Sequence, residues 1–483
     1  MIVMKFGGTS VEDDAAIQRV ADIVLNRVEE RPVVVVSALA GVTDSLLAMS
    51  RAAASGSVDE ALQSLRKLRR RHLTVLNALV EGPAEAVARE QVQTLLDCLQ
   101  DMLRGVAALG ELSPRTNDNV LSTGELLSSR IVSTVLKARG IHSELVDSRR
   151  CILTDASHTK AVPLFDQTSE RLHDQVKPLL QANRIPVMGG FIGATAQGVP
   201  TTLGRGGSDF SAAIVGAALN AQRIEIWTDV EGMMTTDPRL CPQAQRINVI
   251  GFDEASELAY FGAKVLHPAT LIPAVEKNIP VYVLNSRQPA NKGTCIRARA
   301  PRSRTTFRAI AAKTGIKVIN VKSPRVLMAH GLLRRLFETF ELHSCTTDLV
   351  STSEASISVA LDPSCDATGL VQDLQKLGEV EVENSKAIVC LVGKGIHGRV
   401  GIAASVFKTV AAANVNVHMI SQGASEINIS FVVEEDDVPK VVQALHRHFF
   451  EAKGSALADN LHAARTKLRV PLRDQEHSCQ EVG

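Results

Sequence analysis

The sequence TLGRGGSD at residues 202–209, followed by the small-residue run FSAAIVGAALNA, decides how we interpret the first part of the chain. Three glycines stand between a strand-like segment and an expected helix that starts at Ser208 or Asp209, because both residue types are good N-caps. Glycines let the backbone approach a ligand closely, and a helix N-terminus beside the Arg205 guanidinium attracts negative charge. The junction therefore predicts a site for a phosphate or a carboxylate. The alternative is a turn whose glycines serve geometry alone.

Two earlier junctions have the same form. The apolar run MIVMKF (1–6) ends at GGTS (7–10), and a helix is expected from residue 11 to about residue 31. The β-branched run VVVVSA (33–38) does not alternate with polar residues, as expected of a strand buried on both faces, and it ends at the small-residue loop AGVTD (40–44). Ligands bind at the carboxyl ends of strands in open α/β sheets, which is where these loops lie.

The rest of the first 298 residues continues this pattern. Residues 58–112 are charged and rich in leucine and alanine at helical spacing, which predicts an all-helical insertion, and residues 120–140 predict a further helix. Further strand-like runs occur at residues 185–188, 224–228 and 279–284. We therefore expect a parallel-sheet α/β domain over residues 1–298.

The region after the basic stretch PRSRTTFR contains an internal repeat at an offset of 70 residues. The matched pairs are Phe337 with Phe407, Thr339 with Thr409, and Ser351 with Ser421. Two ferredoxin-like βαββαβ units are expected, over residues 312–386 and 387–452. The polar tail at residues 466–483 is expected to be disordered.

Composition excludes several classes of protein. The net charge of +1 and the aromatic share of 3% do not indicate nucleic-acid binding. No apolar run reaches the about 20 residues of a membrane span, and the N-terminal run is too short for a signal peptide. The eight cysteines are scattered without a CxxC pair, which argues against structural zinc and against a disulfide framework. A cytoplasmic protein with reduced thiols is expected.

Six motifs fall in order along the chain: KFGGTS from Lys5, SALAGVTD from Ser37, TGELLS from Thr123, GRGGSD from Gly204, TDVEGMMTTDPR from Thr228 and FGAKVLHP from Phe261. This series resembles the aspartate kinases of the amino acid kinase family, and the C-terminal repeat resembles the tandem ACT domains of their monofunctional members. The resemblance covers nearly the whole chain. It implies an amino acid kinase fold, followed by two ACT domains, and transfer of the ATP γ-phosphoryl group to the side-chain carboxylate of L-aspartate.

Residue types agree with this chemistry. A carboxylate with a pKa near ~4 is already ionised at neutral pH, so this nucleophile needs no general base. The difficulty is electrostatic, because an anion must approach a polyanion. Positioned cations and N–H groups around the transferred phosphoryl are then the main source of catalysis.

The resemblance assigns the residues around the reacting groups. Lys5 and Asp209 are the catalytic candidates: the first neutralises the transferred phosphoryl, and the second organises Mg²⁺, lysine or water. The substrate-binding candidates are Thr43, Glu125, Arg205 and Ser208. Arg205 suits a substrate carboxylate because its guanidinium binds in a bidentate fork, and Glu125 matches the acid that recognises the aspartate ammonium. The ordinary alternatives are an exposed strand lysine, a helix-surface glutamate and a helix-capping aspartate.

The resemblance also marks the nucleotide site. The ATP-contacting candidates are Lys5, Gly7, Gly8, Ser10, Thr228, Asp229, Met234, Arg239 and Lys264. Met234 departs from the family, which often has an aromatic residue there, so the contact with the base is not defined by the resemblance. No metal cage is visible, and Mg²⁺ is expected to arrive with ATP. His267 is expected to be structural.

In the first ACT unit, TTDLVSTSE resembles the effector-binding segment of lysine-sensitive aspartate kinases. The effector candidates are Val326, Thr346, Thr347, Asp348, Ser353 and Glu354. Lysine is the expected effector and threonine the alternative, since Leu332 replaces an aromatic residue of the lysine-sensitive group. The resemblance further implies a homodimer or larger assembly through the ACT domains. The alternative for this segment is a structural β-hairpin.

Two other functions compete with this interpretation. One is an amino acid kinase acting on glutamate, N-acetylglutamate or UMP, against which Glu125 and the paired ACT units argue. The other is an inactive amino-acid sensor, which is not expected to keep Lys5, Arg205, Asp209 and Lys264. A bifunctional kinase–dehydrogenase is not expected, because too little chain follows residue 470 for a dinucleotide domain.

Overall fold

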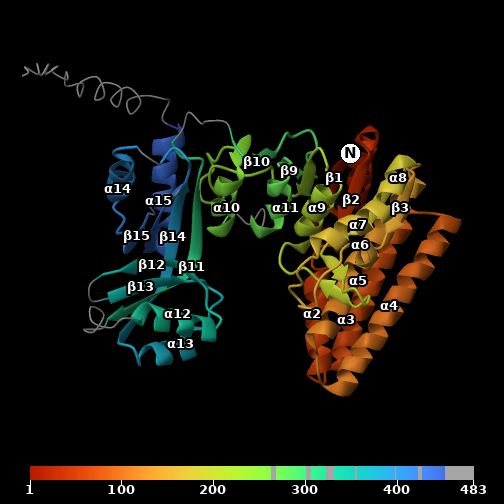
Figure 1. Ribbon diagram of the computed structural model, residues 1–483, viewed down its shortest axis with the longest axis horizontal. Helices are drawn as coiled ribbons and strands as arrows, with labels where there is room; N and C mark the ends of the chain where they lie inside the picture. The colour runs from red at the N-terminus through yellow and green to blue at the C-terminus, as the bar shows by residue number, and fades with distance from the viewer. Residues whose placement is uncertain are drawn as a thin grey trace, which may run out of the picture.

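A computed structural model describes residues 1–262, 268–300, 306–322, 331–353, 356–396, 399–422 and 427–451. Figure 1 shows an N-terminal part, up to residue 300, and a C-terminal part, from residue 306, side by side along the long axis. Lys264, His267, Val326, Glu354 and the tail at residues 466–483 lie outside the described residues. Among the described helices, none is long and apolar enough to cross a membrane.

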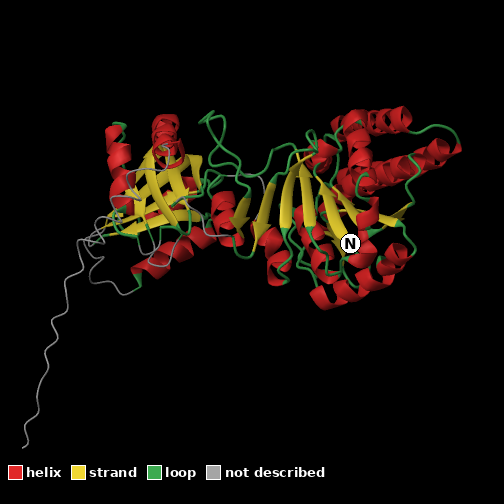
Figure 2. Cartoon of the chain, turned by 90° about the horizontal axis from the view of Figure 1, so that it is seen from above, coloured by secondary structure: helices red, strands yellow, loops and turns green. Residues whose placement is uncertain are grey.

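The N-terminal part is built on an eight-stranded sheet with the order β3-β4-β2-β1-β7-β9-β10-β8. Its strands are β1 (Ile2–Phe6), β2 (Pro32–Val36), β3 (Ser143–Val146), β4 (Ile185–Gly189), β7 (Ile224–Thr228), β8 (Val249–Gly251), β9 (Val281–Asn285) and β10 (Thr294–Arg297). All pairs from β3 to β9 are parallel, whereas β10 runs antiparallel to β9. Every residue of β1 and β2 is buried, because helices cover both faces of the sheet (Figure 2). The predicted α/β class is confirmed.

The helices predicted for this part are present, but several begin or end at other residues than predicted. They are α1 (Asp14–Leu25), α2 (Val42–Ala54), α3 (Val58–Leu79), α4 (Pro83–Leu109), α5 (Pro114–Ala138), α6 (Ser148–Cys151), α7 (Phe165–Gln175), α8 (Lys177–Gln181), α9 (Gly207–Ala218), α10 (Phe252–Tyr260) and α11 (Ile272–Glu276). The helix predicted over residues 11–31 is shorter, because Asp13 accepts a hydrogen bond from the Ala16 amide and caps α1. The predicted helical insertion is α3 and α4, which lie beside α2 and α5 (Figure 1).

The C-terminal part is a six-stranded sheet with the order β12-β13-β11-β14-β16-β15. Its elements are β11 (Ala309–Lys322), α12 (Leu332–Leu342), β12 (Thr347–Thr352), β13 (Ser356–Leu361), α13 (Ala367–Leu374), β14 (Glu379–Val392), α14 (Ile402–Ala412), β15 (Met419–Ser421), β16 (Asn428–Glu434) and α15 (Val438–His446). The predicted repeat is visible in this order, since strand, helix, two strands and helix occur twice.

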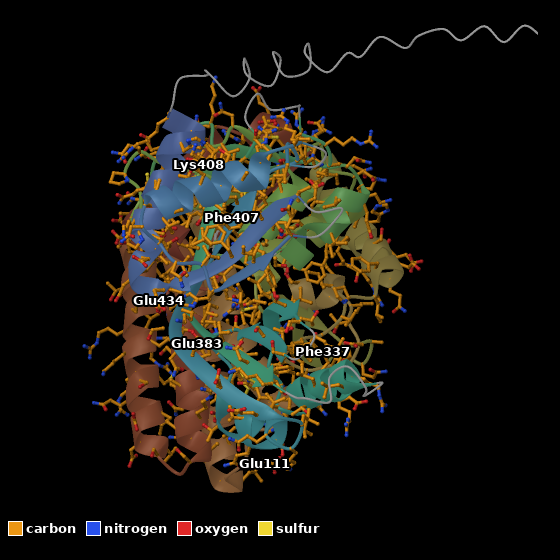
Figure 3. All side chains as sticks on the ribbon, turned by 90° about the vertical axis from the view of Figure 1, so that its left-hand side faces the viewer. Glu111, Phe337, Glu383, Phe407, Lys408 and Glu434 are labelled. Carbon is orange, nitrogen blue, oxygen red and sulfur yellow. A yellow bond between two sulfur atoms is a disulfide. The ribbon has the colours of Figure 1, made fainter. Side chains whose placement is uncertain are left out.

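Equivalent residues of the repeat occupy equivalent places. Phe337 lies on α12 and Phe407 on α14 (Figure 3). On the same helices, the Thr339 and Thr409 hydroxyls each donate a 2.8 Å hydrogen bond to the carbonyl four residues earlier. Ser351 and Ser421 lie on the two edge strands, β12 and β15. The offset of 70 residues therefore reflects a structural repeat.

The two units are interleaved rather than consecutive. Residues 309–313 of β11 pair with residues 388–392 of β14, whereas residues 318–322 pair with residues 379–383. A register shift between Lys313 and Ile316 separates these two halves. The start of β11 therefore belongs to the sheet of the second unit, because β14 serves both units and the second needs one more strand. A sequence repeat does not indicate this exchange.

Reduced thiols are the wrong expectation for one pair of cysteines. Cys345 and Cys365 form a disulfide with a sequence separation of 20 residues and a Cα–Cα distance of 5.1 Å. Cys345 follows α12 and Cys365 precedes α13, and both belong to the hydrophobic core of the first unit. Packing of these two helices brings the cysteines together, which their spacing in the sequence does not show.

One of the contacts between the two parts of the chain is made by the segment that follows β7. The Ile310 amide donates a 2.7 Å hydrogen bond to the Thr235 carbonyl, and the Thr235 hydroxyl lies 2.9 Å from His446 Nε2. Gln443 on α15 donates to the Leu240 carbonyl at 2.9 Å. The loop expected to hold ATP is therefore anchored at its far end on the C-terminal sheet.

Candidate active site

Lys5 extends from the central strand β1 into an ion pair. Its Nζ lies 2.6 Å from Asp209 Oδ1, and the two side chains are 10% and 12% exposed. Burying a lone ammonium is costly, so a partner carboxylate is expected at this depth. The pair joins the first and the fourth of the six motifs, which are about 200 residues apart in the chain.

The start of α9 differs from the prediction. The N-cap is Gly206, which has a φ of 71°, and no side chain caps the helix. Ser208 and Asp209 lie in the first turn instead, so the Asp209 carboxylate is directed to Lys5 and not to the helix end. At the next residue, Gly207, a Cβ would lie 2.6 Å from the Phe191 ring, so the turn fits only glycine.

Glu125 is a buried carboxylate with an unused oxygen. It lies on α5 with 3% of the residue exposed, and its Oε1 accepts a 3.1 Å hydrogen bond from the Ala38 amide. Its Oε2 is buried and has no hydrogen-bond partner among the described residues. Burial raises the pKa of Glu125 to about 8, although the Ala38 amide and the Lys5 charge oppose the shift. The free oxygen suits a cationic group of a ligand.

The candidate substrate-binding residues Glu125, Ser208 and Thr43 lie close together, because glycines allow their segments to pack closely. A Cβ on Gly189 would lie 3.0 Å from Glu125 Cβ, and one on Gly190 would lie 2.7 Å from Ser208 Cβ. Glu125 and Ser208 therefore pack against neighbouring glycines at the end of β4, and only the backbone of these glycines lies between them. On the other side, Gly124 lies against Ala38 and the first residue of α2, so the first turn of α2, which holds Thr43, also reaches this site.

Arg205 is placed on the loop that precedes α9 and is exposed. No hydrogen bond or ion pair to it occurs within the part of the chain that the structure describes, and its guanidinium is therefore available to a ligand. Arg239 differs, because its side chain is 89% exposed and is held by Asp237 in a 2.6 Å ion pair. The structure does not bring Arg239 to Lys5.

A network of short hydrogen bonds joins the nucleotide candidates. Ser10 Oγ lies 2.8 Å from Ser286 Oγ, and Ser286 Oγ donates to the Thr228 carbonyl at 3.1 Å. The Gly7 amide donates to the Trp227 carbonyl at 3.0 Å. The carboxyl ends of β1, β7 and β9 therefore meet at one place. Ser286 was not predicted from the sequence, where its only signal is its position directly after the strand β9.

The remaining nucleotide candidates lie around this network. Gly8 packs closely on the loop after β2, where a Cβ would lie 3.0 Å from the Ala38 carbonyl oxygen. Asp229 is exposed directly after β7, as predicted for a residue that follows a strand. Met234 is half-buried and forms a bridge with Arg246 across the loop.

Asp118 is a second residue that sequence analysis missed. Its side chain is fully buried and accepts hydrogen bonds from the Thr159 amide, His158 Nδ1 and Thr202 Oγ1, the last at 2.6 Å. The carboxylate ties the loop at residues 155–160 to the strand that precedes the glycine-rich turn. A single aspartate in a long helix carries no sequence signal for this role.

A metal ion at the Lys5 site would depend on few protein ligands. Asp209 supplies carboxylate oxygen, which Mg²⁺ prefers, beside Lys5. Among the described residues, the group of three potential ligands that the structure brings together is Cys241, His446 and Glu451. That group lies where α15 meets the loop after β7.

The effector candidates among the described residues lie at one edge of the C-terminal sheet. Thr347 and Asp348 are on β12, preceded by Thr346. Asp348 is 1% exposed at its side chain and binds Lys313 Nζ through both oxygens, at 2.9 and 2.7 Å. Ser353 bonds Ser356 across the turn to β13, with 2.7 Å between the hydroxyl oxygens.

Comparison with known proteins decides the family. A sequence profile described as the amino acid kinase family matches residues 1–285, and one described as an ACT domain matches residues 389–449. The lysine-sensitive aspartokinase 3 of Escherichia coli (strain K12) is 38% identical over 461 residues, covering 93% of this chain and 99% of that protein. The chain belongs to the aspartokinase family. Aspartokinase 1, chloroplastic, of Arabidopsis thaliana is 36% identical over 466 residues, covering 93% of this chain and 80% of that protein.

Solved aspartokinases also have the same fold. E. coli aspartokinase III in complex with lysine and aspartate (T-state) superposes with a TM-score of 0.81 at 37% identity, covering 93% of this chain and 99% of that chain. The same enzyme in complex with aspartate and ADP (R-state) gives a TM-score of 0.80 and covers 100% of that chain. The prediction of an aspartokinase with an amino acid kinase fold and ACT regulation is confirmed.

Proposed function

We propose that this aspartokinase transfers the ATP γ-phosphoryl group to the side-chain carboxylate of L-aspartate and forms 4-phospho-L-aspartate. The observation that supports this most is the buried Lys5–Asp209 pair beside a buried Glu125 whose Oε2 is free of described partners. The E. coli relative solved with aspartate and ADP is 37% identical to this chain. The reaction requires a cation near the transferred phosphoryl group and a carboxylate that binds the ammonium of aspartate, and Lys5 and Glu125 are of these types.

The substrate side follows from the charges of aspartate. Its ammonium binds the free oxygen of Glu125, and one carboxylate binds the guanidinium fork of Arg205. The hydroxyls of Thr43 and Ser208 lie on the first turns of α2 and α9 and donate to the substrate. The second carboxylate then faces Lys5, ionised and ready to attack.

Transition-state stabilisation comes from groups that the fold holds in place before ATP binds. Asp209 and the sheet fix Lys5, whose ammonium offsets charge on the transferred phosphoryl. The backbone of Gly7 and Gly8 and the hydroxyl of Ser10 add donors at the end of β1. No general base is required, because the nucleophile is a carboxylate.

ATP lies over the carboxyl ends of β1 and β7 in this proposal. Thr228 and Asp229 face the ribose or base, Met234 packs on adenine, and Arg239 and Lys264 bind phosphates. Arg239 must leave Asp237 to do so, which its exposed position allows. Mg²⁺ would arrive with the nucleotide and supply neutralisation of phosphate charge, and Asp209 would be the carboxylate that orients it or its water.

Regulation is assigned to the C-terminal part. We propose ACT domains over residues 312–386 and 387–452, with residues 309–313 completing the second sheet, and a catalytic domain over residues 1–298. An amino-acid effector binds Thr346, Thr347, Asp348, Ser353, Glu354 and Val326. Lysine is the favoured effector, since a lysine-sensitive relative is 38% identical, and threonine is the alternative. Assembly into a homodimer or larger oligomer uses the ACT domains.

The proposal is tested by trapping the acyl phosphate. The purified protein, ATP and Mg²⁺ are incubated with L-aspartate and hydroxylamine, with L-glutamate as the parallel substrate. Aspartyl hydroxamate that depends on ATP and on aspartate supports the proposal. Hydroxamate from glutamate alone, or none from either, rejects it.

A further inference from the structure

The environment of Lys313 in the first ACT unit is the starting point. Lys313 Nζ lies 2.9 and 2.7 Å from the two oxygens of Asp348 and 2.7 Å from Asp362 Oδ2. An ammonium has three N–H donors, so these contacts use all of them. Asp348, which is 1% exposed at its side chain, therefore already holds an ammonium that belongs to the chain itself.

Position on the strand explains how Lys313 reaches both acids. It is the last paired residue of the first half of β11, directly before the register shift where the strand passes from one ACT unit to the other. Asp348 lies on β12, and Asp362 follows β13, which lies between β11 and β12 in the sheet. The interleaved strands fix the Lys313 backbone, and its side chain reaches Asp348 and Asp362 at the same time.

The charge of the cluster is not balanced. Two carboxylates face one ammonium, so the cluster carries one excess negative charge if all three groups are ionised. The Asp362 pKa is lowered to about 2: burial opposes ionisation of this carboxylate, but hydrogen bonds from Lys313 and Ser364 outweigh that effect. The excess negative charge therefore favours binding of a second ammonium. This ammonium can bind Asp348 if Lys313 breaks its contact with Asp348 and keeps its contact with Asp362.

The cluster also touches the kinase domain. Lys313 Nζ lies 5.5 Å from the centroid of the Tyr260 ring at the end of α10. Burial, followed by the negative charge of Asp348, raises the pKa of Tyr260 above its usual range. A shift of the Lys313 ammonium therefore changes a contact between the ACT unit and the kinase domain.

We propose that Lys313 is a built-in competitor of the effector. Its ammonium occupies Asp348 in the effector-free enzyme, and the ammonium of an amino-acid effector displaces it onto Asp362. Lys313 thereby sets the effector concentration at which the enzyme is inhibited. This inference rests on the effector site proposed above.

Lys313→Met and Asp362→Asn test the inference in opposite directions. Loss of the competitor in Lys313→Met lowers the half-inhibitory concentration of L-lysine about tenfold, or of L-threonine if that is the effector. Loss of the alternative anchor in Asp362→Asn raises the half-inhibitory concentration several-fold, because a displaced Lys313 then has no partner. Lys317→Met, on the same strand and bonded to the Cys365 carbonyl instead, leaves it unchanged.

The readout is aspartyl hydroxamate formation, with basal activity and circular dichroism as evidence of folding. In the double variant Lys313→Met/Asp362→Asn, the second substitution does not change the half-inhibitory concentration further, because there is no Lys313 ammonium left for Asp362 to bind. An unchanged or raised half-inhibitory concentration in a folded Lys313→Met enzyme, or equal effects of Asp362→Asn with and without Lys313, overturns the inference. The effector site is tested separately with Asp348→Asn. If an amino acid inhibits wild type but not Asp348→Asn, the effector site stands, even when replacing Lys313 does not change the half-inhibitory concentration. If neither amino acid inhibits wild type or Lys313→Met, both the effector site and this inference fail, while kinase activity is judged separately.

Discussion

Lys5 Nζ lies 2.6 Å from Asp209 Oδ1, with each side chain about nine-tenths buried. The pair connects the central strand of the sheet to the first turn of α9. A buried charge without a partner is costly, so each residue holds the other in place. Catalysis and local stability therefore depend on the same contact.

Replacement of Lys5 by methionine is expected to lower kcat at least about a thousandfold, because the transferred phosphoryl loses its buried cation. It should also destabilise the kinase domain by about 3 kcal/mol, because Asp209 is left buried without a partner. Steady-state kinetics and denaturant unfolding measure the two effects.

The double variant Lys5→Met/Asp209→Asn is the matched control. It should recover most of the lost stability, since no lone charge remains, and stay inactive. Near-wild-type turnover in either variant would show that Lys5 does not act on the phosphoryl group.

Arg205 is expected to bind substrate without supporting the fold. Because it is exposed and makes no described ion pair, Arg205→Ala should change the free energy of unfolding by less than about 0.5 kcal/mol. The same variant should raise KM for aspartate about a hundredfold, owing to the lost bidentate contact. Arg104→Ala, an exposed arginine on the α4 surface, should change neither quantity. An unchanged KM in Arg205→Ala would remove this residue from the substrate site.

The raised pKa of Glu125, about 8, predicts how substrate affinity varies with pH. Only the ionised carboxylate attracts an ammonium, and at pH 7 most of the free enzyme holds it protonated. KM for aspartate should therefore fall roughly eightfold between about pH 7 and about pH 8.5. In Glu125→Gln, KM should be high and nearly independent of pH over this range. A wild-type KM that does not vary with pH would argue against ammonium binding by Glu125.

Glu125 should also affect stability, with a defined sign. Between about pH 4.5 and pH 8 the folded state keeps a proton that the unfolded state has lost, so its contribution to stability falls as pH rises. For one such group, the free energy of unfolding can fall by at most about 1.4 kcal/mol for each pH unit. The melting temperature of ligand-free Glu125→Gln should therefore exceed that of wild type by a margin that grows from pH 5 to pH 8. A constant margin would contradict the proton assignment.

The Cys345–Cys365 disulfide should stabilise the first ACT unit. Closing a loop of 20 residues is worth about 3 kcal/mol in the chain-entropy account. Cys345→Ser/Cys365→Ser, or reduction of wild type, should lower the free energy of unfolding of the C-terminal part by up to that amount. Cys98→Ser, an exposed cysteine outside this bridge, serves as the control. Equal stability of reduced and oxidised wild type would show that the bridge adds nothing.

Local sequence signals predicted much of the kinase domain. Buried β-branched runs and glycine-rich ends located the principal strands, and the predicted strand at Lys5 and helix at Glu125 are β1 and α5. The helix cap at Gly206 was missed, because serine and aspartate in the first turn are equally plausible caps in a sequence. Their role only becomes clear once Lys5 is seen to use Asp209.

Contacts between distant segments were beyond the sequence. Ser286 and Asp118 are ordinary polar residues until β9 is placed beside β7 and the loop at residues 155–160 is placed on α5. The interleaved ACT units depend on strand pairing across about 70 residues, and the position of Lys313 at Asp348 depends on that pairing. No periodicity or composition encodes these contacts.

The measurement that tests the central claim most directly is ATP-dependent hydroxamate formation by wild type and Lys5→Met with aspartate or glutamate. The account predicts aspartyl hydroxamate from wild type, none from Lys5→Met, and little or none from glutamate. Product from glutamate in preference to aspartate, or equal product from both proteins, would contradict it.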